Sequence, residues 1–216
     1  MQRAALLVLG VVALLAVGLT GGLLIGSTSK SELAVPAPDS VDVGFLQDMV
    51  MHHQQAITMA SWERDNSTDP ALKNLAYDIE ATQTGQVGRM QGWLELWGAA
   101  QLPSGTHMAW MAGPAAHDHS GSMDAPSGGV ATMPGMASAE ELRALRSTTG
   151  PQLDVLFLQL MLRHHEGGAS MLKYAAENAT QPAVRNLASN MLGSQTNEAN
   201  YLRQLLTARG GTPLPM

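Results

Sequence analysis

An internal duplication constrains this chain more than any other feature. Residues 42–103 align with residues 154–215 without a gap at a constant offset of 112, and 22 of the 62 aligned positions are identical. The most similar segments are FLQDMVMHH, which begins at Phe45, and FLQLMLRHH, which begins at Phe157. Together the two blocks are long enough for one small core. The repeat therefore predicts two related units, each with a His-His pair and two methionines, packed against each other.

Helical periodicity runs through both copies, because apolar residues recur at steps of three and four. Asp39 or Ser40 is placed to cap the first helix, and Pro70 stands in the first turn of the second. We expect helices that begin near residues 41, 70, 151 and 182 and end near residues 66, 98, 178 and 210. Two short-loop helical hairpins joined by a long crossover describe a four-helix bundle, so the predicted fold class is all-α.

The N-terminus carries an uncharged apolar run of 22 residues, Ala4–Ile25, preceded by Arg3. The run is long enough to span a bilayer, so a retained membrane anchor and a cleaved export signal both stay open. In either case Arg3 favours a cytoplasmic N-terminus. The rest of the chain is therefore expected outside the cytoplasm, either anchored to the membrane or secreted into a periplasmic or extracellular space.

The predicted organisation has consecutive segments of different character. They are a signal or transmembrane anchor at 1–26, a tether at 27–40, a first helical hairpin at 41–102, a Met- and His-rich linker at 103–137, and a short helix with the second hairpin at 138–215. The linker has no periodicity and is dominated by Gly, Pro, Ser, His and Met, which is typical of a mobile spacer with metal-binding character. Ser138 and Glu141 form a capping-box pattern at the start of the short helix.

Composition removes several classes of function. The chain has no cysteine, which excludes disulfides, thiolate metal sites and cysteine nucleophiles. Its net charge of −6 argues against non-specific nucleic-acid binding, whose footprint is basic. The sequence has neither a nucleophile elbow nor a phosphate-binding glycine loop, so no catalytic residue is assigned. Any soft-metal chemistry must use methionine, of which there are 14.

Histidines and methionines of the repeat fall on one face of the first helix in each copy. Since a helix turns by about 100° per residue, the His-His pair and both methionines lie along the apolar stripe. The predicted metal ligands are Met49, His52, His53, Met59, Met161, His164, His165 and Met171. Burying four imidazoles is costly unless each is hydrogen-bonded or coordinated. Imidazole suits copper, zinc, iron and nickel and thioether favours Cu(I), so the first candidate is copper, preferably as Cu(I), with silver as a substitute.

The second helix and the linker contain accessory metal-ligand candidates. They are Met90, His107, Met108, Met111, His117, His119 and Met123. A segment of this composition would capture copper loosely and pass it on to another site or protein. A metal-donor or metal-acceptor protein, a membrane contact through the N-terminal helix and a homo-oligomeric state are the candidate partners.

Two alternatives stay open at this level. Core histidines are often structural and methionines fill irregular gaps in helical cores, in which case the chain is a membrane-tethered helical interaction module. The second alternative is a ferritin-like di-iron enzyme. Such enzymes carry Glu-x-x-His motifs on two helices, and this chain contains no Glu-x-x-His.

The segments FLQDMVMHHQQAITMA and FLQLMLRHHEGGASMLKYA, with the NLA and QT segments that follow each, resemble the domain of unknown function 305 family. CopM-like members of that family are exported copper-binding proteins. The resemblance spans about residues 42–209 and implies a ferritin-like four-helix bundle that handles copper outside the cytoplasm, as a metallochaperone or a metal buffer in copper tolerance. Its motif positions place the implied ligands on the same eight residues. In one departure, Leu202 stands where the first copy has Met90.

Overall fold

The structure is a computed structural model that describes residues 35–112 and 128–216. Its elements are the α-helices α2 (Val41–Asn66), α3 (Pro70–Leu96), α4 (Ala139–Ser147), α5 (Pro151–Asn178) and α6 (Pro182–Ala208), and the 3-10 helix η1 (Ala109–Ala112). The predicted N-terminal signal or anchor lies outside the described residues. None of the helices in the described ranges is long and apolar enough to cross a membrane.

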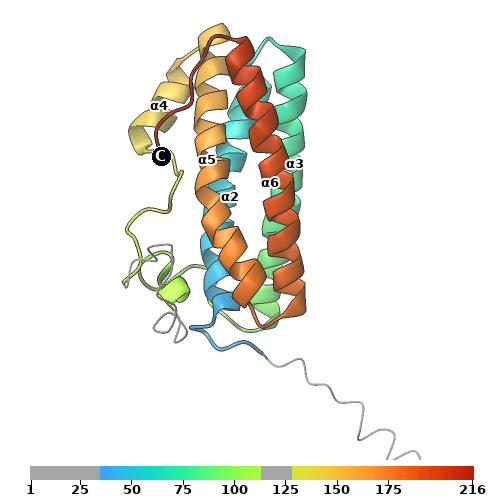
Figure 1. The fold of residues 1–216 in the computed structure, drawn as a ribbon, viewed down its shortest axis with the longest axis vertical. Helices are drawn as coiled ribbons and strands as arrows, with labels where there is room; N and C mark the ends of the chain where they lie inside the picture. The colour runs from blue at the N-terminus through green and yellow to red at the C-terminus, as the bar shows by residue number, and fades with distance from the viewer. Residues whose placement is uncertain (1–34, 113–127) are drawn as a thin grey trace, which may run out of the picture. The chain divides into compact units, whose positions relative to one another are not determined.

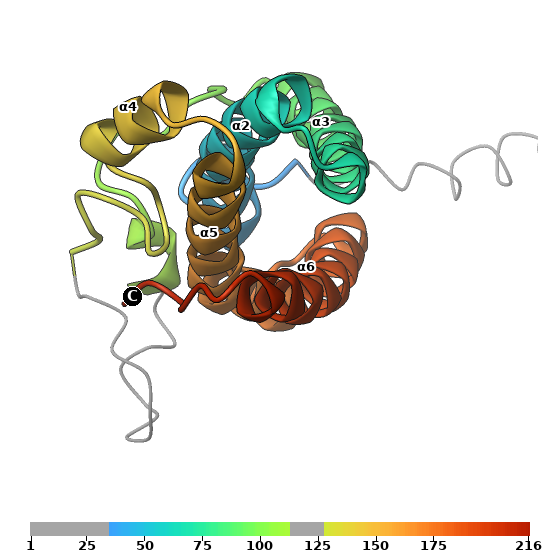
Figure 2. The same cartoon turned by 90° about the horizontal axis from the view of Figure 1, so that it is seen from above.

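Four long helices form a bundle from two hairpins, which confirms the predicted all-α fold. α2 and α3 make the first hairpin, and α5 and α6 make the second (Figure 1). The hairpins meet where α2 packs against α5, and the short α4 lies beside these two helices (Figure 2). The helix carrying the His-His pair in one copy is therefore in direct contact with the corresponding helix of the other.

Helix starts agree with the capping residues expected from the sequence. The Ser40 side chain accepts a hydrogen bond from the Val43 amide, and Ser138 and Glu141 form the predicted capping box. Asp42, at the start of α2, reaches the other hairpin and accepts hydrogen bonds from the amide and hydroxyl of Thr180 just before α6. Both groups lie just before the first turn of α6, so Asp42 fixes the start of that helix relative to α2 and ties the hairpins together.

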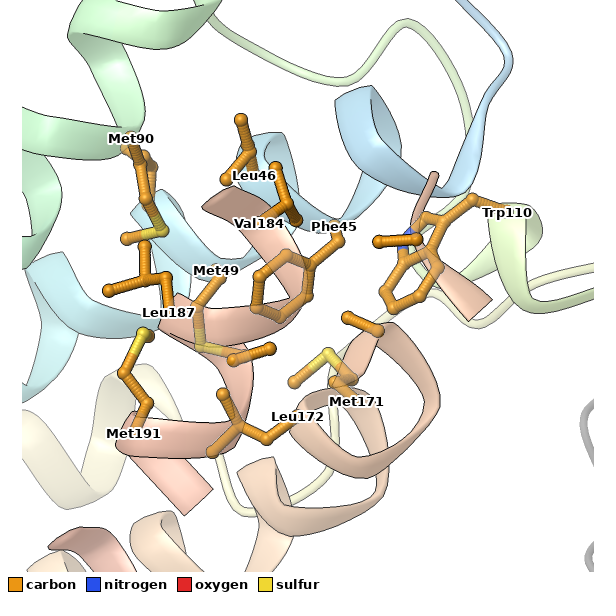
Figure 3. Close-up of a cluster of buried hydrophobic side chains, with 14 of the residues drawn as sticks. Phe45, Leu46, Met49, Met90, Trp110, Met171, Leu172, Val184, Leu187 and Met191 are labelled. Carbon is orange, nitrogen blue, oxygen red and sulfur yellow. The ribbon is translucent and has the colours of Figure 1, made fainter. Parts of the chain in front are cut away.

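Two apolar clusters fill the bundle, one toward each end. The first core cluster includes Phe45, Met49, Met90, Met171, Leu187 and Met191 (Figure 3), and the second includes Met59, Ile79, Phe157, Met161 and Leu202. Each cluster combines the beginning of the His-His helix of one copy with the end of that helix from the other copy. This is the arrangement expected when α2 and α5 run antiparallel.

The described parts of the linker pack onto the bundle, which corrects the expectation of a mobile spacer there. Met108, Trp110, Met111 and Met133 are buried in the first core cluster. Asp48, only 1% exposed, accepts hydrogen bonds from His107 Nδ1, the Met108 amide and Trp110 Nε1. The linker is therefore held by a buried carboxylate on α2, an attachment that requires no periodicity in the linker itself.

A second attachment brings residues 133–137, here called the linker strap, across α2 and α5. Gln55 donates to the Ala137 carbonyl at 2.9 Å and accepts from the Ala137 amide at 2.6 Å. A Cβ at Gly167 would lie 2.4 Å from the carbonyl carbon of Pro134. Only glycine at this position of α5 lets the strap approach so closely.

Candidate metal centre

All eight ligands predicted in the repeat are buried, with exposed fractions of at most 2%. The four imidazoles lie at one level of the bundle, here called the histidine layer: His52, His53, His164 and His165. The rings of His52 and His164 are stacked with centroids 3.8 Å apart and planes inclined by 38°. The centroids of His164 and His165 are 6.4 Å apart. Contact between α2 and α5 therefore brings the two His-His pairs together.

Each Nε2 atom of the histidine layer has an oxygen partner. The pairs are His52 with the Pro134 carbonyl at 3.3 Å, His53 with Gln86 Oε1 at 2.8 Å, His164 with the His52 carbonyl at 3.1 Å, and His165 with Glu198 Oε2 at 2.8 Å. Carbonyl and carboxylate oxygens only accept hydrogen bonds, so Nε2 carries the proton and Nδ1 keeps a lone pair. Histidines that bind metals commonly have this arrangement, with the non-coordinating N–H given to a carbonyl or carboxylate.

The four Nδ1 atoms are buried and have no hydrogen-bond partner among the described residues. A buried polar group without a partner costs about 1–3 kcal/mol. Repetition of that cost at four neighbouring rings needs a physical reason, and coordination of an ion by the Nδ1 lone pairs would supply one.

Two glutamines extend this polar level, and sequence reasoning did not assign them to the site. Gln83 on α3 and Gln195 on α6 occupy corresponding positions in the two copies and are 2% and 5% exposed. Their side-chain amides also have no hydrogen-bond partner in the described parts of the chain. The alignment contained the signal, because Gln-Thr is identical in both copies on an otherwise apolar helix face.

Gly168 leaves room between the histidine layer and one of these glutamines. A Cβ at Gly168 would lie 3.1 Å from His52 Cε1, 3.5 Å from Gln195 Oε1 and 3.6 Å from His52 Nδ1. An imidazole nitrogen and an amide oxygen therefore face the same small space. A side chain at this position would fill it.

Burial lowers the pKa of His52, His53 and His164 and so keeps these three imidazoles neutral at physiological pH. Desolvation lowers the pKa of His52 to about 4 and that of His53 to about 3, although the hydrogen bonds of both rings act in the opposite direction. Desolvation and the neighbouring imidazoles also hold the pKa of His164 well below its usual value. Neutral imidazole is the form that coordinates metals, so these rings would not have to lose a proton before binding an ion.

Methionines lie on both sides of the histidine layer. On each of the four long helices, the buried His or Gln residues of this level lie between a segment of the first core cluster and a segment of the second. Met49 and Met171 belong to the first cluster, together with Met90 and Met191 (Figure 3). Met59 and Met161 belong to the second cluster. The second cluster has Ile79 and Leu202 at the positions that correspond to Met191 and Met90. Thioether donors are therefore concentrated on the first side.

The donor set fits a soft ion better than a hard one. Among the described residues, no group of three or more His, Cys, Asp or Glu side chains is arranged to hold a metal ion. A closed site of the structural zinc type is thus not preformed there. The buried donors at this level are imidazole nitrogens, with thioether sulfurs in the adjoining clusters, and this combination suits Cu(I).

The accessory candidates are divided by the structure. Met90, Met108 and Met111 are buried in the first core cluster. His107 uses Nδ1 for its hydrogen bond to Asp48. His117, His119 and Met123 lie outside the described residues, and their role stays a prediction.

Comparisons with known proteins place this geometry among related folds. A family model described as Domain of unknown function (DUF305) matches residues 42–206. A putative secreted DUF305 protein from Streptomyces coelicolor is 38% identical, with 83% of this chain and 100% of that chain covered and a TM-score of 0.72. A DUF305 fragment from Deinococcus radiodurans is 27% identical, with coverage of 78% and 96% and a TM-score of 0.61.

CopM, another solved structure, is similar in fold. Its Cu(I)-bound form is 24% identical, with 79% of this chain and 98% of that chain covered and a TM-score of 0.57. CopM has also been solved with Cu(II) and with silver bound. Among curated proteins, an uncharacterized protein of Acanthamoeba polyphaga mimivirus is 37% identical over 54 residues, which cover 25% of this chain and 36% of that protein. The match thus spans about a third of the mimivirus protein.

Proposed function

Because the chain belongs to the DUF305 family, whose model matches residues 42–206, we propose that it is an extracytoplasmic copper-binding protein. It would act as a metallochaperone or metal buffer in copper tolerance, with Cu(I) as the preferred ion and silver as a substitute. The apolar run at Ala4–Ile25 supports export. The similar Streptomyces coelicolor protein is described as a putative secreted protein, and CopM has been solved with copper and silver.

One observation carries the proposal. Four buried imidazoles present Nδ1 lone pairs that have no partner in the described residues, while each Nε2 atom is anchored to an oxygen. Each ring is therefore held through Nε2 and keeps Nδ1 available to an ion. The donors would have to move closer together to surround it, because no group of three is preformed among the described residues. Thioether sulfurs from the flanking clusters would complete the coordination of a soft ion. Harder divalent ions would bind this donor set more weakly.

Competition for Cu(I) tests the proposal on the full chain, in detergent if the N-terminus is retained. The protein is titrated into a coloured Cu(I)–chelator complex under reducing conditions. We expect the wild type to withdraw copper and its melting temperature to rise, because the ion binds the native state. The double variant His52→Ala with His164→Ala should lose both effects. Phe157→Leu, which disturbs the core without removing a donor, should keep them.

Failure of the wild type to take copper from the chelator would refute the proposal. Equal copper binding by the wild type and the double histidine variant would refute the assignment of the site. Mass spectrometry of the native complex would give the number of bound ions in each case.

The interaction-module alternative is favoured by the hydrogen bond that every ring already makes through Nε2. On that interpretation the histidines only hold the helices together. The double histidine variant should then be destabilised equally with and without Cu(I), and the wild-type melting temperature should not depend on copper. The same two melting experiments therefore separate the two functions.

A further inference from the structure

A pocket of about 180 Å³ lies between α5 and α6. Its outer part carries exposed or half-exposed polar residues, among them Glu166, Thr196 and Arg203, and its inner part reaches the buried side chains of His165 and Gln195. The pocket therefore connects the protein surface with a ring of the histidine layer.

The inner end of this pocket adjoins the donors of the proposed metal centre. His165 Nδ1 and both amide atoms of Gln195 are buried and, within the described ranges, have no hydrogen-bond partner. Gln195 Oε1 and His52 Nδ1 lie within 3.6 Å of the same point, where Gly168 has no Cβ. Donors from α5 and α6 at the inner end of the pocket thus lie close to a donor from α2.

Comparison of the two copies explains why a pocket forms in the second hairpin. Ala169 and Ala199 line it. The first copy has the larger Ile57 and Val87 at the corresponding positions. Val87 belongs to the first core cluster and Ile57 packs against it. We attribute the pocket in the second hairpin to these smaller side chains, because the first hairpin has larger side chains at both positions.

We propose that this pocket is the port through which Cu(I) enters and leaves the histidine layer. The inference rests on the proposed function and adds a route to it. The ion would pass the Glu166–Arg203 ion pair at the outer part of the pocket, meet His165 and Gln195, and then reach the stacked His52 and His164 rings. No bond is made or broken apart from metal–ligand bonds, and the ion keeps its oxidation state.

Side chains from the first copy can be transplanted to close the port. The double variant Ala169→Ile with Ala199→Val copies residues that the fold already accepts at equivalent positions, and it removes no donor. Stopped-flow transfer of Cu(I) from a coloured chelator complex gives the loading rate, and the equilibrium titration gives the affinity. We expect loading to slow by an order of magnitude or more, as it does when entry requires a conformational change, at unchanged affinity. Ala81→Val, at an exposed position of α3, is the matched control and should load like the wild type.

A charge variant tests the same port without enlarging any core residue. Arg203 is 45% exposed, and the first copy has Gln91 at its position. Arg203→Gln removes a positive charge from the outer part of the pocket, which should speed the entry of a cation by about two- to fivefold at low salt. The gain should disappear at high salt, because exposed charges are screened.

Outcomes of these measurements separate the port from the function. If the wild type takes up no copper, the proposed function fails and the port has nothing to admit. If the wild type loads and Ala169→Ile with Ala199→Val loads equally fast, the port is wrong and the function stands. If the double variant loses Cu(I) affinity as well as loading rate, the port proposal is also overturned, since the pocket would then be part of the binding site. Should the double variant not fold, an unchanged loading rate of Arg203→Gln overturns it.

Discussion

Glu63 provides the sharpest test of the electrostatic account of this bundle. It lies near the end of α2, is 0% exposed, and neither carboxyl oxygen has a hydrogen-bond partner in the described residues. Asp154 and Ser67 lie next to it, and Ser67 donates its hydroxyl hydrogen bond to Asp154 at 2.8 Å. Burial, followed by the charge of Asp154, raises the pKa of Glu63 to about 8, although Ser67 and Arg209 act in the opposite direction. The folded protein thus holds a proton that the unfolded chain releases.

The sign of the effect on stability follows from that raised pKa. Protonated Glu63 favours the native state, so its contribution is complete below the ordinary pKa of 4.5 and is lost as the pH rises through about 8. Since one pKa unit corresponds to roughly 1.4 kcal/mol, the loss at pH 8 amounts to up to about 4 kcal/mol. Glu63→Gln removes the charge and keeps the shape. After about 1–2 kcal/mol for a buried amide without a partner, a net gain of about 2 kcal/mol remains at high pH.

Urea denaturation of the metal-free wild type and Glu63→Gln measures this gain. The variant should be more stable by about 2 kcal/mol near pH 8 and should show no such gain near pH 5. The melting temperature near pH 8 should rise by about 5 °C, since 1 kcal/mol corresponds to ~2–4 °C for a chain of this size. Comparing the two proteins at each pH cancels the titrating groups that do not interact with Glu63. Glu177→Gln, at an exposed position of α5, is the control. A difference between Glu63→Gln and the wild type that does not change with pH would refute the reasoning.

Three further substitutions test other parts of the structure. Gly167→Ala places a Cβ 2.4 Å from Pro134 and should cost about 1–3 kcal/mol in thermal unfolding; an unchanged melting temperature would contradict the close packing of the strap. Asp48→Asn weakens three hydrogen bonds to the linker, including that of Trp110, and should make the linker more sensitive to limited proteolysis, with an unaltered digestion pattern arguing against this anchor. Gln83→Leu removes a buried amide and should stabilise the metal-free protein by about 1 kcal/mol while weakening Cu(I) binding in the chelator titration; a loss of stability would show that the amide is satisfied in solution.

Local patterns in the sequence were sufficient to predict the bundle and the side chains that face its interior. The apolar period, the caps at Ser40 and Ser138 and the proline at the start of α3 depend on residues within a few positions of one another, so they can be read without knowing the fold. The offset of 112 between copies further predicted that the His-His pairs are equivalent. The helix bounds, the fold class and the family follow from these features.

Tertiary packing alone decided how those side chains are used. Whether His52 stacks on His164 depends on the contact between α2 and α5, and which ring nitrogen stays available depends on oxygens as distant in sequence as Pro134. The linker gave no periodic signal because it is held by individual side-chain contacts, among them those of Asp48 and Gln55, and not by a regular helix face. Residues on one helix share a face because of a fixed rotation per residue. The distances between helices depend instead on the volumes of side chains that meet only in the folded core, and those distances determine both the polar level and the pocket beside it.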